Sequence, residues 1–406
     1  MDPKKEAIRA LAREAALMPQ EEMLEVGKHH KSLTIGIPRE TSFQERRVAL
    51  VPESVALLVS RGHEVVVETN AGKESSFHDK DYSEAGARIV YEPKDVFTSD
   101  IIMKVAPPSL DEVKLMTGRQ TLFSALQLTV QPKDSLQIMM QKKITAVAWD
   151  YIKDETGIYP VVRAMGEIAG NTSVLIAAEY LSSANAGTGL MFGGISGVQP
   201  TEVVILGAGT VGEFAARAAL GLGSSVKVFD NSIYKLRRLQ NDLGTRLWTS
   251  TIQPKILMES LSKADVVIGA LRASYGRTPC VVTGEMVSHM KFGSVIVDIS
   301  IDQGGCFETS RVTTHDNPIY KEYGVIHYCV PNVASRVSKT ASYALSNIFA
   351  PMVLSVGDEG GVTNLVKHQS GFRHGVYLYH GTLVNEVIGE AFDLPYKDLD
   401  LLLAAL

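Results

Sequence analysis

The amino-acid sequence predicts an α/β protein with two doubly wound, parallel-sheet domains of the Rossmann type and a cleft between them. Short runs rich in β-branched residues alternate with segments whose apolar residues recur at helical spacing. This alternation is typical of parallel strands that are covered by helices on both faces. The strands form two series, separated by one long, mostly apolar helical segment at residues 160–184. A length of 406 residues is sufficient for two such domains.

The first series of strands begins after residue 32. Its members are predicted at 33–37, 64–68, 100–105, 121–126 and 145–150. Helices are predicted between them at 51–62 and 109–118. The long helical segment suits a spine between the domains, and the glycine-rich stretch 186–200 is expected to be a loop.

The second series follows this loop, and each of its strands is nearly continuous in apolar residues, as buried parallel strands are. Its members are predicted at 202–207, 224–230, 264–270, 294–300 and 325–330. The helical segment after residue 339 is expected to cross back to the first domain. We therefore predict an N-terminal helical extension at 1–32, one domain at 33–160 and 339–406, and a second domain at 161–338.

Composition excludes several classes of protein. Acidic and basic residues nearly balance, 45 against 40, so nothing indicates a nucleic-acid partner or an anionic membrane surface. No apolar run reaches the ~18 residues of a membrane-spanning helix. The cysteines, Cys280, Cys306 and Cys329, are too few for a disulfide framework and lack metal-ligand spacing, so we expect no metal site and a cytoplasmic location.

A dinucleotide-binding turn is predicted at Gly207, Gly209 and Gly212, which match G-x-G-x-x-G between a strand and a helix. The first glycine permits the tight turn, the second lets the backbone approach a pyrophosphate, and the third allows close helix–strand packing. Asp230, at the end of the next strand, is placed to accept hydrogen bonds from the adenosine ribose and favours NAD over NADP. Lys235 lies nearby and could modify that choice. The alternative is a Rossmann-like turn that binds nothing.

Three charged residues are candidates for the chemistry. Lys104 ends an apolar strand, and Asp302 follows another strand at the edge where chemistry gathers in open α/β sheets. Arg47 precedes the first helix. Together they suit a small anionic substrate, because a guanidinium can hold a carboxylate with two hydrogen bonds and a lysine can polarise a carbonyl. The alternatives are a lysine that extends to solvent at a strand edge, a loop-capping aspartate and a solvated surface arginine.

The sequence resembles the alanine dehydrogenases, which share their fold with the NAD(H)-binding alpha subunit of proton-translocating transhydrogenase. The resemblance covers nearly all of the chain after residue 32. The segment DQGGCFETSRVTTH at 302–315 is highly specific and favours the alanine dehydrogenase branch. The other matching segments are IGIPRE (35–40), ERRVALVP (45–52), ETNAGKESSFHDKDYSEAGA (68–87), IIMKVAPP (101–108), GIYPVVRAMGEIAG (157–170), FGGISGVQPTEVVILGAGTVG (192–212), HYCVPN (327–332) and TASYALSN (340–347).

By this resemblance, Arg47 and Lys104 are similar to the pair that holds the carboxylate and carbonyl of pyruvate, and Asp302 to the family's active-site aspartate. Asp230 and Lys235 are similar to contacts with the adenosine ribose. Gln127 and Asn332 are expected at the substrate. The other positions similar to cofactor contacts are Gly207, Gly209, Thr210, Val211, Gly212, Leu271, Ile299 to Asp302, Arg311, and Val330 to Val333 with Asn332.

The resemblance implies the reversible conversion of L-alanine, NAD and water to pyruvate, NADH and ammonium by a homohexamer, with NAD bound at 161–338 and the substrate at 33–160 and 339–406. The chain departs from the family at its proton-transferring histidine, where it has Gln127, which cannot act as an acid or a base. Ala125 stands where the family has a tyrosine, Gly166 where it has a serine, and Pro331-Asn332-Val333 where it has Ala-Asn-Met.

Three hypotheses follow. In the first, the chain is an alanine dehydrogenase in which Asp302, with Lys104 or a bound water, transfers the protons. In the second, the same chemistry acts on a larger amino acid or a secondary amine, which the space at Ala125 would admit. In the third, the chain is a transhydrogenase-alpha-like protein that binds NAD(H) without turnover and needs a partner.

Overall fold

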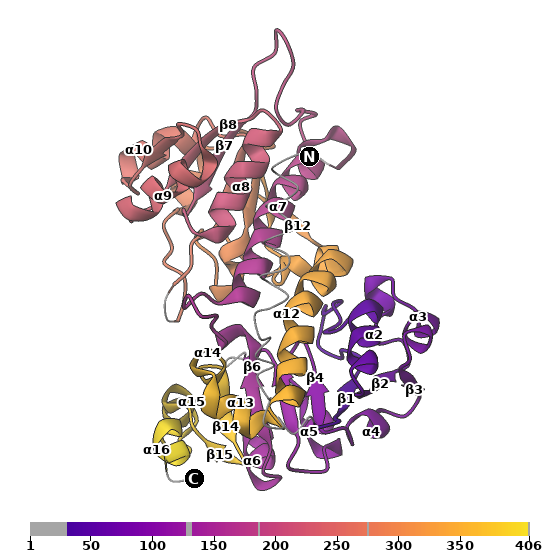
Figure 1. Cartoon of the computed structure of the whole chain (residues 1–406). Helices are drawn as coiled ribbons and strands as arrows, with labels where there is room; N and C mark the ends of the chain where they lie inside the picture. The colour runs from indigo at the N-terminus through magenta and orange to yellow at the C-terminus, as the bar shows by residue number, and fades with distance from the viewer. Residues whose placement is uncertain (1–30, 127–131, 186, 274–275, 405–406) are drawn as a thin grey trace, which may run out of the picture.

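The protein folds into two lobes, each built around one sheet, as Figure 1 shows. The computed structural model describes residues 31–126, 132–185, 187–273 and 276–404. Nearly all of the predicted N-terminal extension, as well as Gln127, lies outside these described residues.

The first lobe contains an 8-stranded sheet with the order β15-β14-β6-β5-β4-β1-β2-β3. The strands β1 to β6 are parallel, whereas β14 and β15 run antiparallel at one edge. Along β2, Val65 and Val67 pack into one apolar cluster and Val66 into another, so both faces of the sheet are buried. The strands are β1 (Thr34–Ile37), β2 (Glu64–Glu68), β3 (Arg88–Val90), β4 (Ile101–Met103), β5 (Thr121–Ser124), β6 (Thr145–Ala148), β14 (Val376–Tyr379) and β15 (Thr382–Leu383).

Helices from both ends of the chain cover this sheet. They are α2 (Pro52–Ser60), η1 (Lys73–Ser75), α3 (Asp79–Glu84), α4 (Pro93–Val96), α5 (Leu110–Leu115), α6 (Lys133–Gln141), η2 (Trp149–Tyr151), α12 (Ser338–Asp358), α13 (Val362–His368), α14 (Ser370–Arg373), α15 (Glu386–Phe392) and α16 (Leu399–Ala404). The helices α12 to α16 and the strands β14 and β15 therefore pack with the first sheet.

The second lobe contains a 7-stranded sheet with the order β12-β13-β11-β10-β7-β8-β9, in which only β12 is antiparallel. Its strands are β7 (Glu202–Leu206), β8 (Ser225–Phe229), β9 (Trp248–Ser250), β10 (Val266–Gly269), β11 (Val295–Asp298), β12 (Ile319–Glu322) and β13 (Val325–Tyr328). Its helices are α7 (Pro160–Leu181), η3 (Ser183–Asn185), α8 (Thr210–Gly221), α9 (Ile233–Leu243), α10 (Pro254–Leu261), α11 (Gly284–Ser288), η4 (Ile299–Gln303) and η5 (Val333–Val337).

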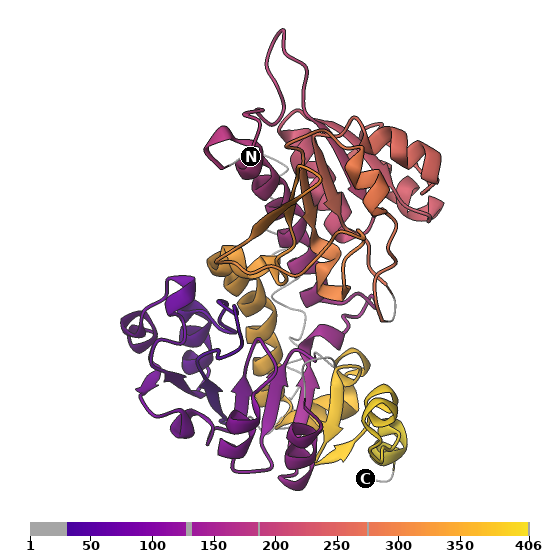
Figure 2. The same cartoon turned by 180° about the vertical axis from the view of Figure 1, so that it is seen from behind.

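The chain passes between the lobes twice, outward along α7 and back through η5 and α12 (Figures 1 and 2). The helix α12 contacts both α7 and α2, so it packs against elements of each lobe. On this topology we propose the division of the chain that the sequence suggests, at residues 160 and 338.

The α/β fold class with two doubly wound sheets is confirmed, with one addition. Both sheets are mixed, because β12 and β14 run antiparallel to their neighbours β13 and β6. The sequence analysis missed β12, β14 and β15 as well as the short parallel strands β3 and β9. The outermost strands β3, β9, β12 and β15 are short or carry exposed residues, so they lack the continuous apolar pattern of buried strands, whereas β14 is buried and apolar along its length. Lys321 in β12 and Arg88 in β3 are such exposed residues.

The close packing of α7 on α8 gives a test of the fold. A Cβ atom on Gly170 would overlap the carbonyl oxygen of Val211 and lie 2.8 Å from the Cβ of Phe214. We expect Gly170→Ala to lower the free energy of unfolding in urea by about 1–3 kcal/mol, although alanine favours helix. Gly221→Ala, where no atom lies within 4 Å of the added Cβ, is the control and should not destabilise the protein. Equal stability of both variants would contradict the packing.

Candidate active site

The two sheets reverse their strand order at equivalent places. In the first sheet β1 lies beside β4, and in the second β7 lies beside β10, with the later strands added on opposite sides. Ligands of doubly wound sheets bind outside the carboxyl ends of the strands at such switch points. The loops that follow these strands carry Arg47, Lys104, the glycine turn and Leu271, so the sequence predictions fall at the expected edges.

The glycine turn has the shape that a dinucleotide requires. Gly207 has a φ of 117°, and a Cβ there would overlap the carbonyl oxygen of Ala270. A Cβ on Gly212 would overlap the carbonyl oxygen of Gly207. Gly209 differs, because its φ is −80° and no protein atom lies within 4 Å of its Cβ position. The protein itself does not need a glycine at 209, but a phosphate approaching the backbone in front of α8 does.

Asp230 already binds the backbone on both sides. Its Oδ2 accepts a hydrogen bond from the amide of Ala208 at 2.8 Å, and its Oδ1 accepts one from the amide of Ser232 at 2.7 Å. The carboxylate thus ties the glycine turn to the loop after β8, and a ribose hydroxyl must use its remaining lone pairs. The side chain of Lys235 is exposed. Arg238, which the sequence analysis missed, donates to the carbonyl oxygen of Ala208 at 3.3 Å.

The other predicted cofactor contacts begin or follow elements of the second sheet. Thr210 and Val211 open α8 and face Gly166, whose Cβ position lies 3.4 Å from Thr210 Cγ2. Leu271 follows β10 directly after the Ala270 carbonyl that packs on the glycine turn, and Ile299 follows β11. The exposed side chain of Arg311 lies over the ring of Tyr320, with 4.0 Å from its Cζ to the ring centroid.

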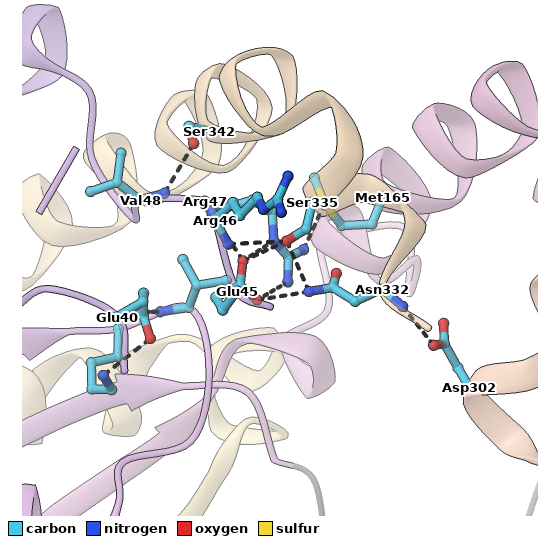
Figure 3. Close-up of polar contacts among 12 residues, drawn as sticks. Glu40, Glu45, Arg46, Arg47, Val48, Met165, Asp302, Asn332, Ser335 and Ser342 are labelled. Atoms are coloured by element: carbon cyan, nitrogen blue, oxygen red, sulfur yellow. Dashed lines mark hydrogen bonds and ion pairs between the residues drawn. The ribbon is translucent and has the colours of Figure 1, made fainter. Parts of the chain in front are cut away.

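A chain of polar contacts joins Asp302 in the second lobe to Arg47 in the first, as Figure 3 shows. Asp302 Oδ1 accepts a hydrogen bond from the amide of Asn332 at 2.9 Å. The Asn332 side chain donates to Glu45 Oε2 at 3.0 Å, and its backbone φ of 54° is one that asparagine tolerates. Glu45 accepts two hydrogen bonds from the Arg47 guanidinium, from Nε at 2.7 Å and from Nη2 at 2.6 Å.

The surroundings of two acidic groups at this junction shift their pKa values in opposite directions. Burial alone would raise the pKa of Glu45, but the charge and hydrogen bonds of Arg47 outweigh it, and the pKa is lowered. Desolvation by the surrounding protein raises the pKa of Asp302 above its ordinary value, although its side chain still reaches solvent and the Asn332 amide and the charges of Arg47 and Arg272 oppose the shift. Asp302 is therefore the carboxyl of this chain of contacts that is better suited to exchange a proton near neutral pH.

The position of Lys104 counts against its predicted contact with a substrate carbonyl. Its side chain is 0% exposed, and its Nζ lies 3.1 Å from Glu40 Oε2 and 3.0 Å from Glu112 Oε1. Burial alone would lower the pKa of Lys104, but the two carboxylates outweigh it and the pKa is raised. A cation so enclosed is neutralised inside the protein and holds the end of β4 to the loop after β1 and to α5.

A pocket of about 310 Å³ opens beside Arg47. Its lining includes the cations Arg39, Arg46 and Lys73, with Glu74 as the acidic residue outside the buried ion pairs. The pocket therefore offers a small anion more positive than negative groups.

The sequence analysis missed Glu45, Arg272 and Asp150. Glu45 stands in the matching segment beside Arg47, and Arg272 comes directly after Leu271. Asp150 follows the strand β6, so the same rule that identified Asp302, a carboxylate at the carboxyl end of a parallel strand, could have identified it.

Comparisons with known proteins agree along almost the whole chain. Residues 36–169 match the family model described as "Alanine dehydrogenase/PNT, N-terminal domain", and residues 173–386 match that of the C-terminal domain. Alanine dehydrogenase of Mycolicibacterium smegmatis is 39% identical over 90% of this chain and 98% of its own. A solved L-alanine dehydrogenase aligns with a TM-score of 0.83 at 36% identity, covering 89% of this chain and 99% of its own. A transhydrogenase from Sinorhizobium meliloti aligns with a TM-score of 0.73 at 26% identity, covering 87% and 99%.

Within the part of the chain that the structure describes, no group of three or more His, Cys, Asp or Glu side chains could hold a metal ion. None of the helices in the described ranges is long and apolar enough to cross a membrane.

The open space at Gly209 predicts an effect on binding without one on folding. We expect Gly209→Val to leave the thermal unfolding temperature within a degree or two, because no protein atom occupies that space. The same variant should weaken NADH binding, measured by fluorescence titration, by about tenfold or more because the side chain blocks the pyrophosphate. Unchanged NADH affinity would exclude the turn as the cofactor site.

The buried ion pairs of Lys104 predict a large effect on stability. Lys104→Met leaves Glu40 and Glu112 without their counter-charge, so we expect the free energy of unfolding at neutral pH to fall by about 3–5 kcal/mol. Lys114→Met is the matched control, since Lys114 is exposed and pairs with Asp111 at the surface, where the effect should stay below about 1 kcal/mol. A Lys104→Met protein as stable as the parent would contradict the structural role.

Proposed function

The chain belongs to the alanine dehydrogenase/PNT family, and on that premise we propose that it catalyses the reversible oxidative deamination of L-alanine to pyruvate and ammonium. It is an NAD-dependent amino-acid dehydrogenase, and the choice of alanine is the finer step of the proposal. The observation that supports this proposal is the chain of contacts from Asp302 through Asn332 and Glu45 to Arg47, which links a carboxylate of the second lobe to an arginine of the first.

The residues of the second lobe suit NAD. The amides at the start of α8, from Thr210 and Val211, would hold the pyrophosphate, and Gly209 leaves it room. Asp230 would face the adenosine ribose, while Leu271 and Ile299 would flank the cofactor at the ends of β10 and β11. When bound, NAD supplies the acceptor for the hydride that leaves C2 of alanine.

The proton transfers fall on side chains of this chain. The ammonium group of alanine must lose a proton before its C2 can be oxidised, and Asp302 is our candidate acceptor because its pKa is raised by burial. We propose that Gln127 stands where the family has its histidine, so the chain must supply another group for the later proton transfers.

Arg47 would donate fewer hydrogen bonds to the substrate carboxylate than the sequence suggests. Its Nε and Nη2 already bind Glu45, so a two-pronged grip on substrate requires that Glu45 be displaced. Nη1, which contacts Met165 Sδ at 3.3 Å, is the nitrogen without a carboxylate partner among the described residues. We therefore propose a single hydrogen bond from Nη1 to the substrate carboxylate, and no substrate contact for Lys104.

A second candidate function is the dehydrogenation of a larger amino acid or a secondary amine. The pocket of about 310 Å³ favours it, since this exceeds what pyruvate needs and the pocket's cations would accept an additional acidic group. The third hypothesis, a transhydrogenase-alpha-like protein that binds NAD(H) without turnover, is less well supported, because the Sinorhizobium meliloti transhydrogenase is 26% identical to this chain whereas two alanine dehydrogenases are 36% and 39% identical.

Location and assembly are part of the proposal. All three cysteines are free thiols, two of them buried, which supports a reducing cytoplasm. By family resemblance we propose a homohexamer. The loop between α7 and β7 exposes apolar side chains that a second copy could cover, namely Leu190, Met191, Ile195 and Val198.

The proposed function is tested by the loss of NADH absorbance with pyruvate and ammonium. We expect steady turnover by the parent and a loss of about 10²-fold or more in kcat for Asp302→Asn, since the amide cannot take a proton. NADH binding by the variant should stay within about twofold, because the asparagine can still accept the Asn332 hydrogen bond.

The outcomes separate the candidates. Absence of turnover with pyruvate but turnover with larger 2-oxo acids or cyclic imines would replace alanine by the second candidate. NADH binding without turnover on any of these substrates would leave the transhydrogenase-like alternative.

A further inference from the structure

Asp150 is a carboxylate of the first lobe that the proposed reaction has not yet used. It lies in η2, directly after β6, whose parallel neighbour β5 ends at Ser124. Its Oδ1 accepts a hydrogen bond from the amide of Leu126 at 3.0 Å, just past the end of β5. In the described part of the chain, backbone amides are the hydrogen-bond donors to this carboxylate, and its side chain is partly exposed.

The charge of Arg272, a residue of the second lobe, lowers the pKa of Asp150. The exposed Arg272 follows Ala270 and Leu271, the residues packed against Gly207 of the glycine turn. The charge of Arg272 acts on Asp150 and also on Asp302. The two carboxylates, one from each lobe, therefore share one arginine beside the predicted dinucleotide turn.

We propose that Asp150 is a catalytic acid–base residue, which activates the water that hydrolyses the substrate's imine and then protonates the departing nitrogen. This inference rests on the proposed dehydrogenase function. Gln127 has no titratable group for proton transfer, and the inference assigns that proton transfer to Asp150 of the first lobe.

The reaction balances with Asp150 in this role. After C2 has given its hydride to NAD, the substrate is an iminium ion, and water adds to C2 as its proton passes to the Asp150 carboxylate. The new C–O bond gives a carbinolamine. Asp150 then returns the proton to the nitrogen, and the C–N bond breaks with its electron pair on nitrogen as the C2 hydroxyl gives its proton back to the Asp150 carboxylate. Pyruvate is released, and the ammonia takes up that proton and leaves as ammonium.

The environment of Asp150 suits both halves of this exchange. Burial raises its pKa to about 6, against the opposing effects of the Leu126 amide, its own amide and the charge of Arg272. A group with this pKa is mostly ionised at neutral pH, yet gives its proton back readily. Asp302 accepts a hydrogen bond from the Asn332 amide, and the charges of both Arg47 and Arg272 lower its pKa. The two carboxylates therefore have different electrostatic surroundings.

The test compares Asp150→Asn with the parent in the deamination of alanine across the pH range. We expect the kcat/KM of the parent to rise with pH around pH 6, because Asp150 then loses its proton and becomes a base. We call this rising part of the pH profile the acidic limb. Asp150→Asn should lose at least about 10²-fold in kcat together with this limb, and its NADH affinity should stay within about twofold.

Two further variants keep the inference falsifiable. Asp150→Glu keeps a carboxylate and should recover part of the rate with a displaced limb, which a purely structural role would not produce. Asp134→Asn, at an exposed position in the first turn of α6, is the control and should match the parent. Should Asp150→Asn fail to fold, the displaced limb of Asp150→Glu carries the test.

The outcomes distinguish this inference from the function on which it rests. A parent without turnover on alanine or pyruvate overturns the proposed function, and the inference with it. An active parent whose rate and pH profile survive in Asp150→Asn overturns the role of Asp150 alone. An active parent whose limb disappears in Asp150→Asn and moves in Asp150→Glu supports both.

Discussion

The buried carboxylate of Glu45 is the contact on which the junction between the lobes depends. It accepts hydrogen bonds from Arg47 of its own loop and from Asn332 and Ser335 of the segment that leaves the second sheet. A buried ion pair is costly unless its remaining lone pairs are satisfied, and these bonds satisfy them. Because the backbone amide of Asn332 also donates a hydrogen bond to Asp302, the position of the carboxylate that we propose as proton acceptor depends on how Glu45 is held.

The same constraint bears on the substrate-binding roles predicted for Arg47 and Lys104. A cation that is removed from water needs a counter-charge nearby, and both Arg47 and Lys104 have found theirs within the protein. What remains for an anionic substrate is the Nη1 of Arg47 and the partly exposed cations around the pocket, such as Arg46. We therefore propose that substrate recognition in this chain depends less on one arginine–lysine pair than the resemblance implies.

Much of the fold could be predicted because its information is local. A buried parallel strand such as β7 is a continuous apolar run, and the spacing of glycines in the turn at Gly207 predicts its backbone conformation. Ligands of open α/β sheets bind beyond the carboxyl ends of the strands, and this rule likewise identified Asp302 as a candidate from the sequence alone. The partners of these residues could not be predicted, because Glu45 meets Asn332 across 287 positions of sequence, and no local pattern encodes that meeting. The ion pair of Lys104 with Glu40 is of the same kind, since it forms only when the loops after β1 and β4 meet.

Placing proton-handling carboxylates on different lobes makes the chemistry depend on the junction itself. Asp302 is positioned by a contact that runs to Glu45, whereas Asp150 is positioned by the Leu126 amide within the first lobe. Only the field of Arg272 is common to both. Arg272 shares its lobe with Asp302, and Arg47 shares its lobe with Asp150, so a closer approach of the lobes brings Arg272 nearer to Asp150 and Arg47 nearer to Asp302. Each cation then lowers the pKa of the carboxyl opposite it, whereas the loss of water from the junction raises both pKa values. The proton-accepting forms that oxidation of an ammonium group requires are therefore favoured only where the approaching cation outweighs the loss of water.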